Sequence, residues 1–120
     1  MLYIGIDLGT SACKLLLVDG SGAVLREVTK EYPLSFPQPG WSEQAPEDWW
    51  KAVMQGMSEL LCGFDAAQVV GIGAGGQMHG LVALDEDDNV IRPAILWNDG
   101  RTAKEVDYLN NEIGKGRLSR

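Results

Sequence analysis

The first residues that could take part in chemistry lie near the N-terminus, where the carboxylate of Asp7, the hydroxyls of Thr10 and Ser11 and the ammonium group of Lys14 follow one another closely. A turn at Gly9, Thr10 and Ser11 can present backbone N–H groups to an anion, and a neighbouring carboxylate can hold a hydrated cation. Together they supply the electrostatic half of phosphoryl transfer. We therefore predict that this turn and Lys14 contact the phosphates of a nucleotide, and that Asp7 binds Mg²⁺ through water.

Two structural interpretations stay open for the same residues. The Asp7 carboxylate could instead cap the turn by accepting the N–H groups of residues 9–11. Lys14 could be a strand residue on a solvated face. The spacing G-x-x-x-x-G-K is absent, which excludes a P-loop.

A second group of candidates follows a glycine pair at residues 75–76. His79 is the only histidine, and a lone histidine often has a structural role. It comes just after a predicted strand, however, where open α/β sheets bind ligands. Gln77 and His79 could donate and accept hydrogen bonds, and Met78 could add an apolar contact, which together suit a sugar.

The third group is Trp97-Asn98-Asp99-Gly100-Arg101. Trp97 could stack on the C–H face of a sugar or could belong to the core. Asp99 could accept hydrogen bonds from sugar hydroxyls, cap the following helix, or do both. Arg101 could pair with an acid nearby.

Hydrophobic patterning predicts the elements that position these residues. Antiparallel strands are expected at 2–8, 12–19 and 23–31, followed by a proline-rich loop and a helix at 46–62 that begins at Pro46. Its expected apolar stripe is Trp50, Val53 or Met54, Met57 and Leu61. A buried strand at 69–74 should then return parallel to the first strand, with the helix as the crossover.

Weaker elements are expected in the second half of the chain. We predict short strands at 81–84 and 93–97, and a helix at 101–113 with a capping box formed by Thr102 and Glu105. The acidic run at 85–89 lacks the glycine and glutamate of a calcium loop, so it reads as a solvated hairpin turn. This α/β order describes the beginning of a mixed sheet, and we expect a piece of a longer protein.

Composition restricts the other functions. The chain has 120 residues and a net charge of −7, without the basic stripe that nucleic-acid binding needs. Cys13 and Cys62 are expected to be buried free thiols of a reducing compartment. Neither a signal peptide nor a membrane span is recognisable, so we expect a cytoplasmic protein. An unfinished sheet exposes an edge, which favours association between chains, for example as a homodimer.

Four stretches of the chain resemble known motifs. IGIDLGTS at residues 4–11 is similar to the first phosphate motif of the actin-like ATPase superfamily. WSEQ at 41–44, GQMHG at 76–80 and ILWNDGR at 95–101 resemble the FGGY carbohydrate kinases, in particular the members that act on D-xylulose. The last two stretches are the more specific ones, although kinases of gluconate and other pentuloses carry near variants.

The resemblance implies an actin-like, ribonuclease-H-like α/β fold, of which residues 1–120 would form the N-terminal part of the first domain. It implies ATP- and Mg²⁺-dependent phosphorylation of the 5-hydroxyl of D-xylulose, or of a related sugar such as ribulose or gluconate. The implied cofactor contacts are Asp7, Gly9, Thr10, Ser11 and Lys14, with Asp7 nearest the metal. The implied sugar contacts are Gln77, Met78, His79, Trp97 and Asp99.

The catalytic base of such kinases comes from later in the chain, so no base is assigned here and the 120 residues alone are expected to be inactive. The alternative is a non-catalytic actin-fold module that binds nucleotide as a sensor or scaffold. Such a module would not need the motifs at 76–80 and 97–101.

Overall fold

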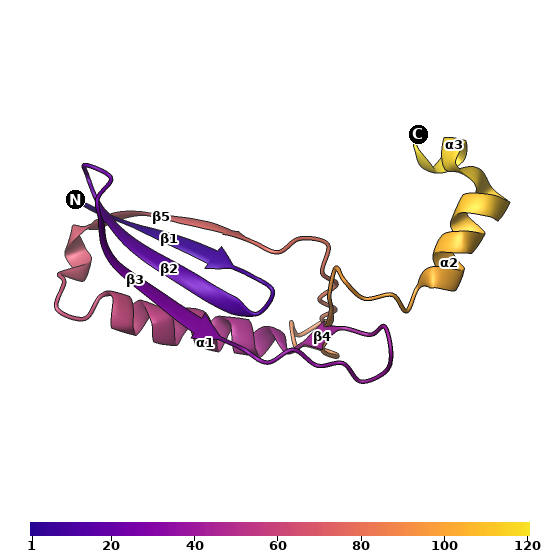
Figure 1. The fold of residues 1–120 in the computed structure, drawn as a ribbon, viewed down its shortest axis with the longest axis horizontal. Helices are drawn as coiled ribbons and strands as arrows, with labels where there is room; N and C mark the ends of the chain where they lie inside the picture. The colour runs from indigo at the N-terminus through magenta and orange to yellow at the C-terminus, as the bar shows by residue number, and fades with distance from the viewer.

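A computed structural model describes residues 1–120, and its centre is a mixed four-stranded sheet. Strands β1 (Leu2–Leu8), β2 (Ala12–Asp19) and β3 (Val24–Glu31) run antiparallel, and β5 (Val69–Gly76) adds parallel to β1. The order across the sheet is β3-β2-β1-β5. Helix α1 (Pro46–Leu60) and the 3₁₀ turn η1 (Ala66–Gln68) form the crossover to β5, as predicted (Figure 1).

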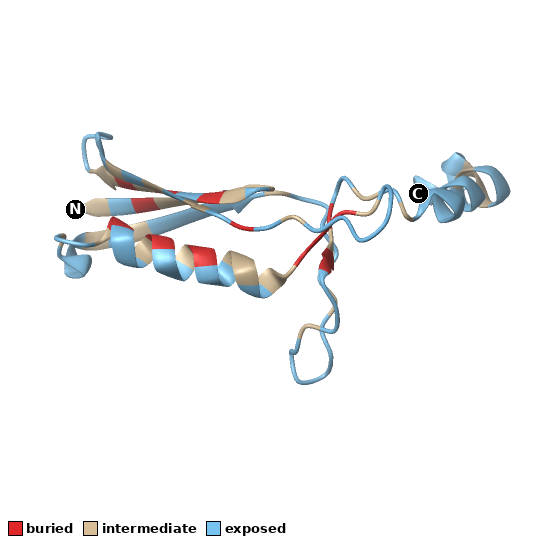
Figure 2. Ribbon diagram, turned by 60° about the horizontal axis from the view of Figure 1, so that its bottom comes forward, coloured by how far each residue is buried: buried red, intermediate tan, exposed pale blue.

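Helix α1 covers one face of the sheet and creates the core (Figure 2). Pro46 lies in its first turn, as expected. The predicted apolar stripe is confirmed at Val53, Met57 and Leu61, which pack against the core, but it was wrong at Trp50, which is 67% exposed. The buried residues of the helix are Ala52, Gly56 and Leu60, and a Cβ at Gly56 would lie 2.5 Å from Leu15 Cδ1. The missing side chain at Gly56 lets the helix approach the sheet closely at Leu15, while Trp50 and Met54 stay outside this contact.

The opposite face of the sheet is open, and the edge strand β5 is exposed on both faces. It was expected to be buried, yet only Val69 and Gly71 are even partly buried. Ile72, beside Ile4 on the side of α1, is 61% exposed. The strand also extends to Gly76, so the glycine pair 75–76 belongs to the strand rather than to the loop after it. The apolar pattern correctly predicted a strand, but α1 packs mainly on β2 and β3 and leaves this edge strand uncovered.

A smaller pairing lies beyond the end of the sheet. Strand β4 (Glu43–Gln44) pairs antiparallel with β6 (Ala94–Ile95). The strand expected at 93–97 is therefore only two residues long, and the one expected at 81–84 reduces to isolated bridges from Leu81 and Leu84. Both segments pair over short lengths because neither meets a continuous neighbouring strand.

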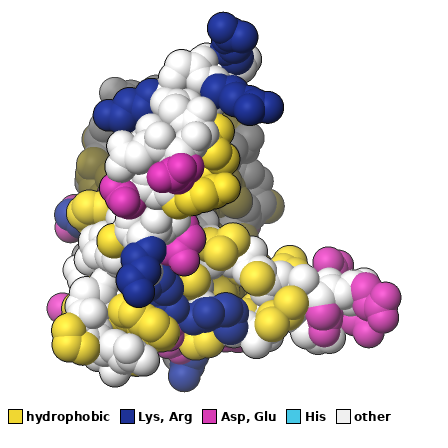
Figure 3. Space-filling view, turned by 90° about the vertical axis from the view of Figure 1, so that its right-hand side faces the viewer, with side chains coloured by type: hydrophobic (Ala, Val, Ile, Leu, Met, Phe, Trp, Pro, Cys, Tyr) yellow, Lys and Arg dark blue, Asp and Glu magenta, His cyan; other side chains and the backbone are white.

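The acidic turn is a solvated turn, as predicted. Asp85 accepts hydrogen bonds from the backbone N–H groups of Asp87 and Asn89, which lowers its pKa. Leu84 and Val90 form a bridge on either side of it. Acidic side chains gather on a tip that projects from the molecule (Figure 3).

The C-terminal helices extend away from the sheet (Figure 1). Helix α2 (Ala103–Tyr108) continues into a π-helical turn η2 (Leu109–Gly114) and a last turn α3 (Lys115–Leu118). Thr102 makes no side-chain cap, so the predicted capping box is absent, whereas Gly114 interrupts the helix as expected with φ of 88°. The radius of gyration is 18.7 Å, against about 14 Å for a compact domain of this length.

The two cysteines differ in environment. Cys13 is fully buried beneath α1, and burial raises the pKa of its thiol. Cys62 is exposed just after α1, which corrects the prediction that both are buried. The helix in fact ends at Leu60, two residues before Cys62. No helix of the structure has the length and apolar character that crossing a bilayer requires.

Candidate functional site

The carbonyl oxygens of the turn between β1 and β2, at residues 9–11, each accept a hydrogen bond from another part of the chain. Gly9 O accepts the Tyr32 hydroxyl, Thr10 O accepts Gln44 Nε2 at 2.5 Å, and Ser11 O accepts the backbone N–H of Tyr32 at 3.1 Å. The N–H of Gly9 closes the turn by donating to the Ala12 carbonyl. The N–H groups of Thr10 and Ser11 have no acceptor within the chain, so they remain available to an anion.

Asp7 lies beside this turn at the end of a groove on the open face of the sheet. Register places it across from Lys14 on β2 and from Gly75 on β5. The groove encloses about 380 Å³, and much of its floor is backbone because Gly5, Gly73 and Gly75 line it. A Cβ at Gly73 or Gly75 would contact nothing within 4 Å and would instead occupy the groove.

The Asp7 carboxylate is exposed and accepts no hydrogen bond from the turn, which rules out the capped-turn interpretation. No group of three or more potential metal ligands exists in the chain. A single free carboxylate next to a turn whose N–H groups could bind an anion nonetheless fits Mg²⁺, which usually keeps several waters and takes only one or two protein carboxylates. Asp7 is the residue that would hold such an ion.

Lys14 lies on the same face but is paired with Glu27 on β3, with Nζ 3.0 Å from Oε1. Both side chains are about half exposed. Exposed ion pairs contribute only about 0–1 kcal/mol. Lys14 can therefore exchange Glu27 for a phosphate at little cost, so the structure is compatible with both interpretations of this residue.

A second cavity adjoins the turn. It encloses about 340 Å³ and is lined by Thr10, Gly76 and the predicted sugar contacts Gln77, Met78, His79 and Trp97. Gly76 is required where β5 ends, because a Cβ there would lie 2.7 Å from Leu8 O. The next N–H, that of Gln77, donates to the same oxygen at 2.8 Å. The end of β1 thus fixes where the loop at 77–79 begins.

Trp97 and His79 both project toward solvent in this region. Trp97 is 57% exposed, so the core interpretation was wrong, and its indole Nε1 donates to Thr10 Oγ1 at 3.1 Å. This hydrogen bond joins the ring to the turn at residues 9–11. His79 is exposed and has φ of 61°, a left-handed conformation that turns the backbone sharply within the loop after β5.

Asp99 differs from the other predicted contacts because its carboxylate is fully engaged. Oδ1 accepts the backbone N–H and Nε of Arg101, at 2.9 and 2.8 Å. Oδ2 accepts Arg101 Nη2 at 2.6 Å and the backbone N–H of Ser42 at 2.7 Å. These donors, Arg101 above all, hold the pKa of Asp99 far below its usual range. Asp99 also makes no cap for α2, where Thr102 is the N-cap residue.

Arg101 connects Asp99 to the β4 segment. Its Nη2 lies 2.8 Å from Glu43 Oε1, and its guanidinium stacks 3.7 Å from the ring centre of Trp41. Arg92 pairs with the same Glu43 oxygen at 2.7 Å. Asp99 and Glu43 raise the pKa of Arg101 above its ordinary value. This network fastens residues 41–44 to residues 92–101 and so sets the position of Trp97.

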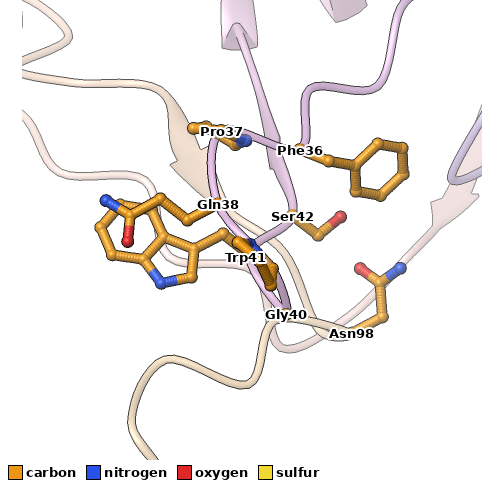
Figure 4. A pocket seen from close by; sticks show the side chains of 8 residues that line it. Phe36, Pro37, Gln38, Gly40, Trp41, Ser42 and Asn98 are labelled. Atoms are coloured by element: carbon orange, nitrogen blue, oxygen red, sulfur yellow. The ribbon is translucent and has the colours of Figure 1, made fainter.

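A third groove, of about 430 Å³, lies on the proline-rich loop. Phe36 and Trp41 line it, and Gln38, Ser42 and Asn98 supply its polar side chains (Figure 4). No charged side chain lines it, so it offers no counter-charge to a phosphate.

Sequence reasoning assigned no role to two residues of the site. Tyr32, just after β3, donates its hydroxyl to the turn at Gly9, and Gln44 connects this turn to Gln77. Gln44 stood in a motif that the resemblance had singled out, but its partners are 34 and 33 residues away. No local pattern predicts contacts of that range.

Comparison with known proteins finds similar sequences along almost the whole chain. Residues 2–120 match the N-terminal domain of the FGGY family of carbohydrate kinases. The chain is 46% identical over 116 residues to the xylulose kinase of Klebsiella pneumoniae, covering 97% of this chain and 24% of that protein.

Solved structures of similar proteins confirm the actin-like fold class. A ligand-bound xylulose kinase from Lactobacillus acidophilus superposes with a TM-score of 0.89 at 30% identity, over 98% of this chain and 23% of that one. A gluconate kinase from the same organism gives 0.87 at 30% identity, over 99% and 24%. The chain therefore spans about a quarter of the length of these relatives, and it belongs to the FGGY family of carbohydrate kinases.

Proposed function

We propose that these residues form part of an ATP-dependent sugar kinase that transfers the γ-phosphoryl group to the 5-hydroxyl of D-xylulose. The observation that carries the proposal is the shared position of Thr10. It belongs to the turn with free N–H groups, and it also lines the cavity of Gln77, Met78, His79 and Trp97. A phosphate donor and a hydroxyl acceptor bound on the two sides would meet at this residue.

On the nucleotide side, Thr10, Ser11 and Gly9 form the turn that receives the phosphates, and Lys14 adds positive charge after leaving Glu27. The groove floored by glycines admits the phosphate chain next to Asp7. Mg²⁺ bound near Asp7 would supply neutralisation of the charge on the phosphate oxygens. Phosphoryl transfer depends largely on such positioning and electrostatics.

On the sugar side, Gln77 and His79 bind hydroxyls, while Met78 and Trp97 form the apolar wall. Asp99 acts mainly through Arg101 and Ser42, because its oxygens already accept four hydrogen bonds. The proton of the acceptor hydroxyl is removed by a base that we place outside residues 1–120. The isolated 120 residues should accordingly show no turnover.

The substrate preference is supported by relatives named xylulose kinase at up to 47% identity, while the gluconate kinase is a 30% match. The test uses the full-length protein with ATP and Mg²⁺, and measures kcat/KM for D-xylulose, D-ribulose and D-gluconate. D-xylulose should give the highest value. Absence of saturation by any sugar would instead favour a nucleotide sensor.

The variant His79→Asn tests the sugar site without disturbing the loop, since asparagine tolerates a positive φ. We expect kcat/KM for D-xylulose to fall about tenfold, as for one lost hydrogen bond. Asp88, the other non-glycine residue at positive φ, has φ of 64° and provides the matched control Asp88→Asn. Equal kinetics of both variants would contradict the role of His79.

A further inference from the structure

Gln44 lies between the turn at residues 9–11 and the loop at 77–79, and it is only 2% exposed. Its Nε2 donates to Thr10 O at 2.5 Å. Its Oε1 accepts two hydrogen bonds, from Trp49 Nε1 at 2.9 Å and from Gln77 Nε2 at 3.1 Å. One buried amide thus contacts the turn, helix α1 and the loop that begins at Gln77.

The orientation of this amide is dictated by its neighbours. An indole N–H can only donate, and a backbone carbonyl can only accept. Because Trp49 supplies the donor and Thr10 supplies the carbonyl, Gln44 must turn its oxygen toward Trp49 and its NH₂ toward Thr10. The reversed amide would leave both partners unpaired, at about 1–3 kcal/mol for each buried group.

The same constraint passes on to Gln77. The second lone pair of Gln44 Oε1 requires a donor, so Gln77 must present its NH₂ group there. Gln77 Oε1 is then left buried without any partner in the chain. It belongs to a residue that lines the 340 Å³ cavity, and a buried acceptor of this kind calls for a donor from a ligand.

We propose that Gln44 is a positioning residue that fixes the amide of Gln77, so that Gln77 offers its carbonyl oxygen to a hydroxyl of the sugar. Gln77 thereby selects a substrate that donates a hydrogen bond at this position. A site built to pair with a hydroxyl rejects an analogue that lacks it, because the acceptor stays buried and unpaired.

The kinetic test rests on the proposed function and uses the full-length kinase. Single-deoxy analogues of D-xylulose, each lacking the hydroxyl at carbon 1, 3 or 4, are compared with D-xylulose. In the unmodified enzyme one analogue should lose at least about fivefold in kcat/KM. In Gln44→Met, which removes the acceptor for Gln77 with little change in length, that penalty should shrink to about twofold or less.

Two further variants separate positioning from a general structural role. Gln44→Glu keeps an acceptor for Gln77 in either protonation state, so the deoxy penalty should return. Gln55→Met changes an exposed glutamine of α1 and should leave the penalty intact. A penalty that is the same in Gln44→Met as in the unmodified enzyme, or that fails to return in Gln44→Glu, overturns the proposal.

A second measurement uses the unmodified protein and does not depend on kinase activity. In the NMR spectrum of the unmodified protein, the side-chain NH₂ of Gln77 should exchange slowly with solvent because it donates to a buried oxygen. Fast exchange of both protons overturns the positioning role even if the kinase activity is found. Slow exchange in a protein that phosphorylates none of the sugars supports Gln44 while rejecting the proposed function.

Discussion

The two faces of the central sheet have the same strands but opposite characters. Beneath α1, Ile4, Cys13, Leu15 and Leu17 are nearly inaccessible and form the core. On the other face the same strands present Gly5, Asp7, Lys14 and Leu16 to an open groove. Side chains alternate between the faces of a strand. Stability and chemistry can therefore occupy neighbouring positions in the sequence without sharing a contact.

This separation explains where polar groups have partners. In the groove the Asp7 carboxylate is free and Lys14 makes only an exposed ion pair. In the region that joins β4 to residues 92–101, Glu43 and Asp99 are each bound by arginine. A polar group with a complete set of partners positions its neighbours, whereas one with unused capacity is available to a ligand.

The largest effect is expected from Leu15→Ala on the covered face. Leu15 is fully buried, and truncating a buried leucine costs about 2–5 kcal/mol of unfolding free energy. Leu16→Ala on the open face should cost clearly less, because Leu16 is only partly buried. Denaturant unfolding of the two full-length variants measures this contrast. Equal losses would mean that another part of the protein covers the groove at Leu16.

The complementary change is Asp7→Asn on the open face. It should lower kcat about 10²- to 10³-fold, the size of effect seen when one group that stabilises transition-state charge is removed. Thermal stability should stay unchanged, because the carboxylate has no partner to lose. Glu31→Gln, an exposed acid on β3, is the control for loss of one negative charge. A large drop in the melting temperature of Asp7→Asn would show that the two faces are not independent.

The elements of the sheet were predictable from sequence because their patterns are local. Strand alternation gave β1, β2 and β3 nearly to the residue, and the helix at Pro46 followed from its first turn. The buried side of α1 was mispredicted at Trp50, because apolar character alone does not reveal that Gly56 permits the closest approach to the sheet. The exposure of β5 was equally unpredictable, since this edge strand has the apolar composition of a covered one.

The candidate site shows the same division. The positions of Asp7, Thr10 and Gln77 at strand ends followed from the order of strands and turns. What could not be predicted was how the turn is held, because Tyr32 and Gln44 reach it from segments more than 20 residues away. Side-chain contacts between distant segments depend on packing that no sequence period encodes.

The smallest predicted effect comes from a change at Tyr32, which links the core to the turn at residues 9–11 by donating its hydroxyl to Gly9 O. Burial, followed by the nearby Cys13 and Asp7, raises the pKa of Tyr32 from 10.0 to about 12. Folding therefore favours the protonated phenol, so the stabilising contribution is complete below pH 10 and is lost as the pH rises toward 12. Tyr32→Phe should remove this decline from the pH profile of unfolding free energy. It should also raise the KM for ATP modestly, because Gly9 O loses its donor and the turn is held less firmly. A decline that persists in Tyr32→Phe would assign the alkaline loss of stability to other groups.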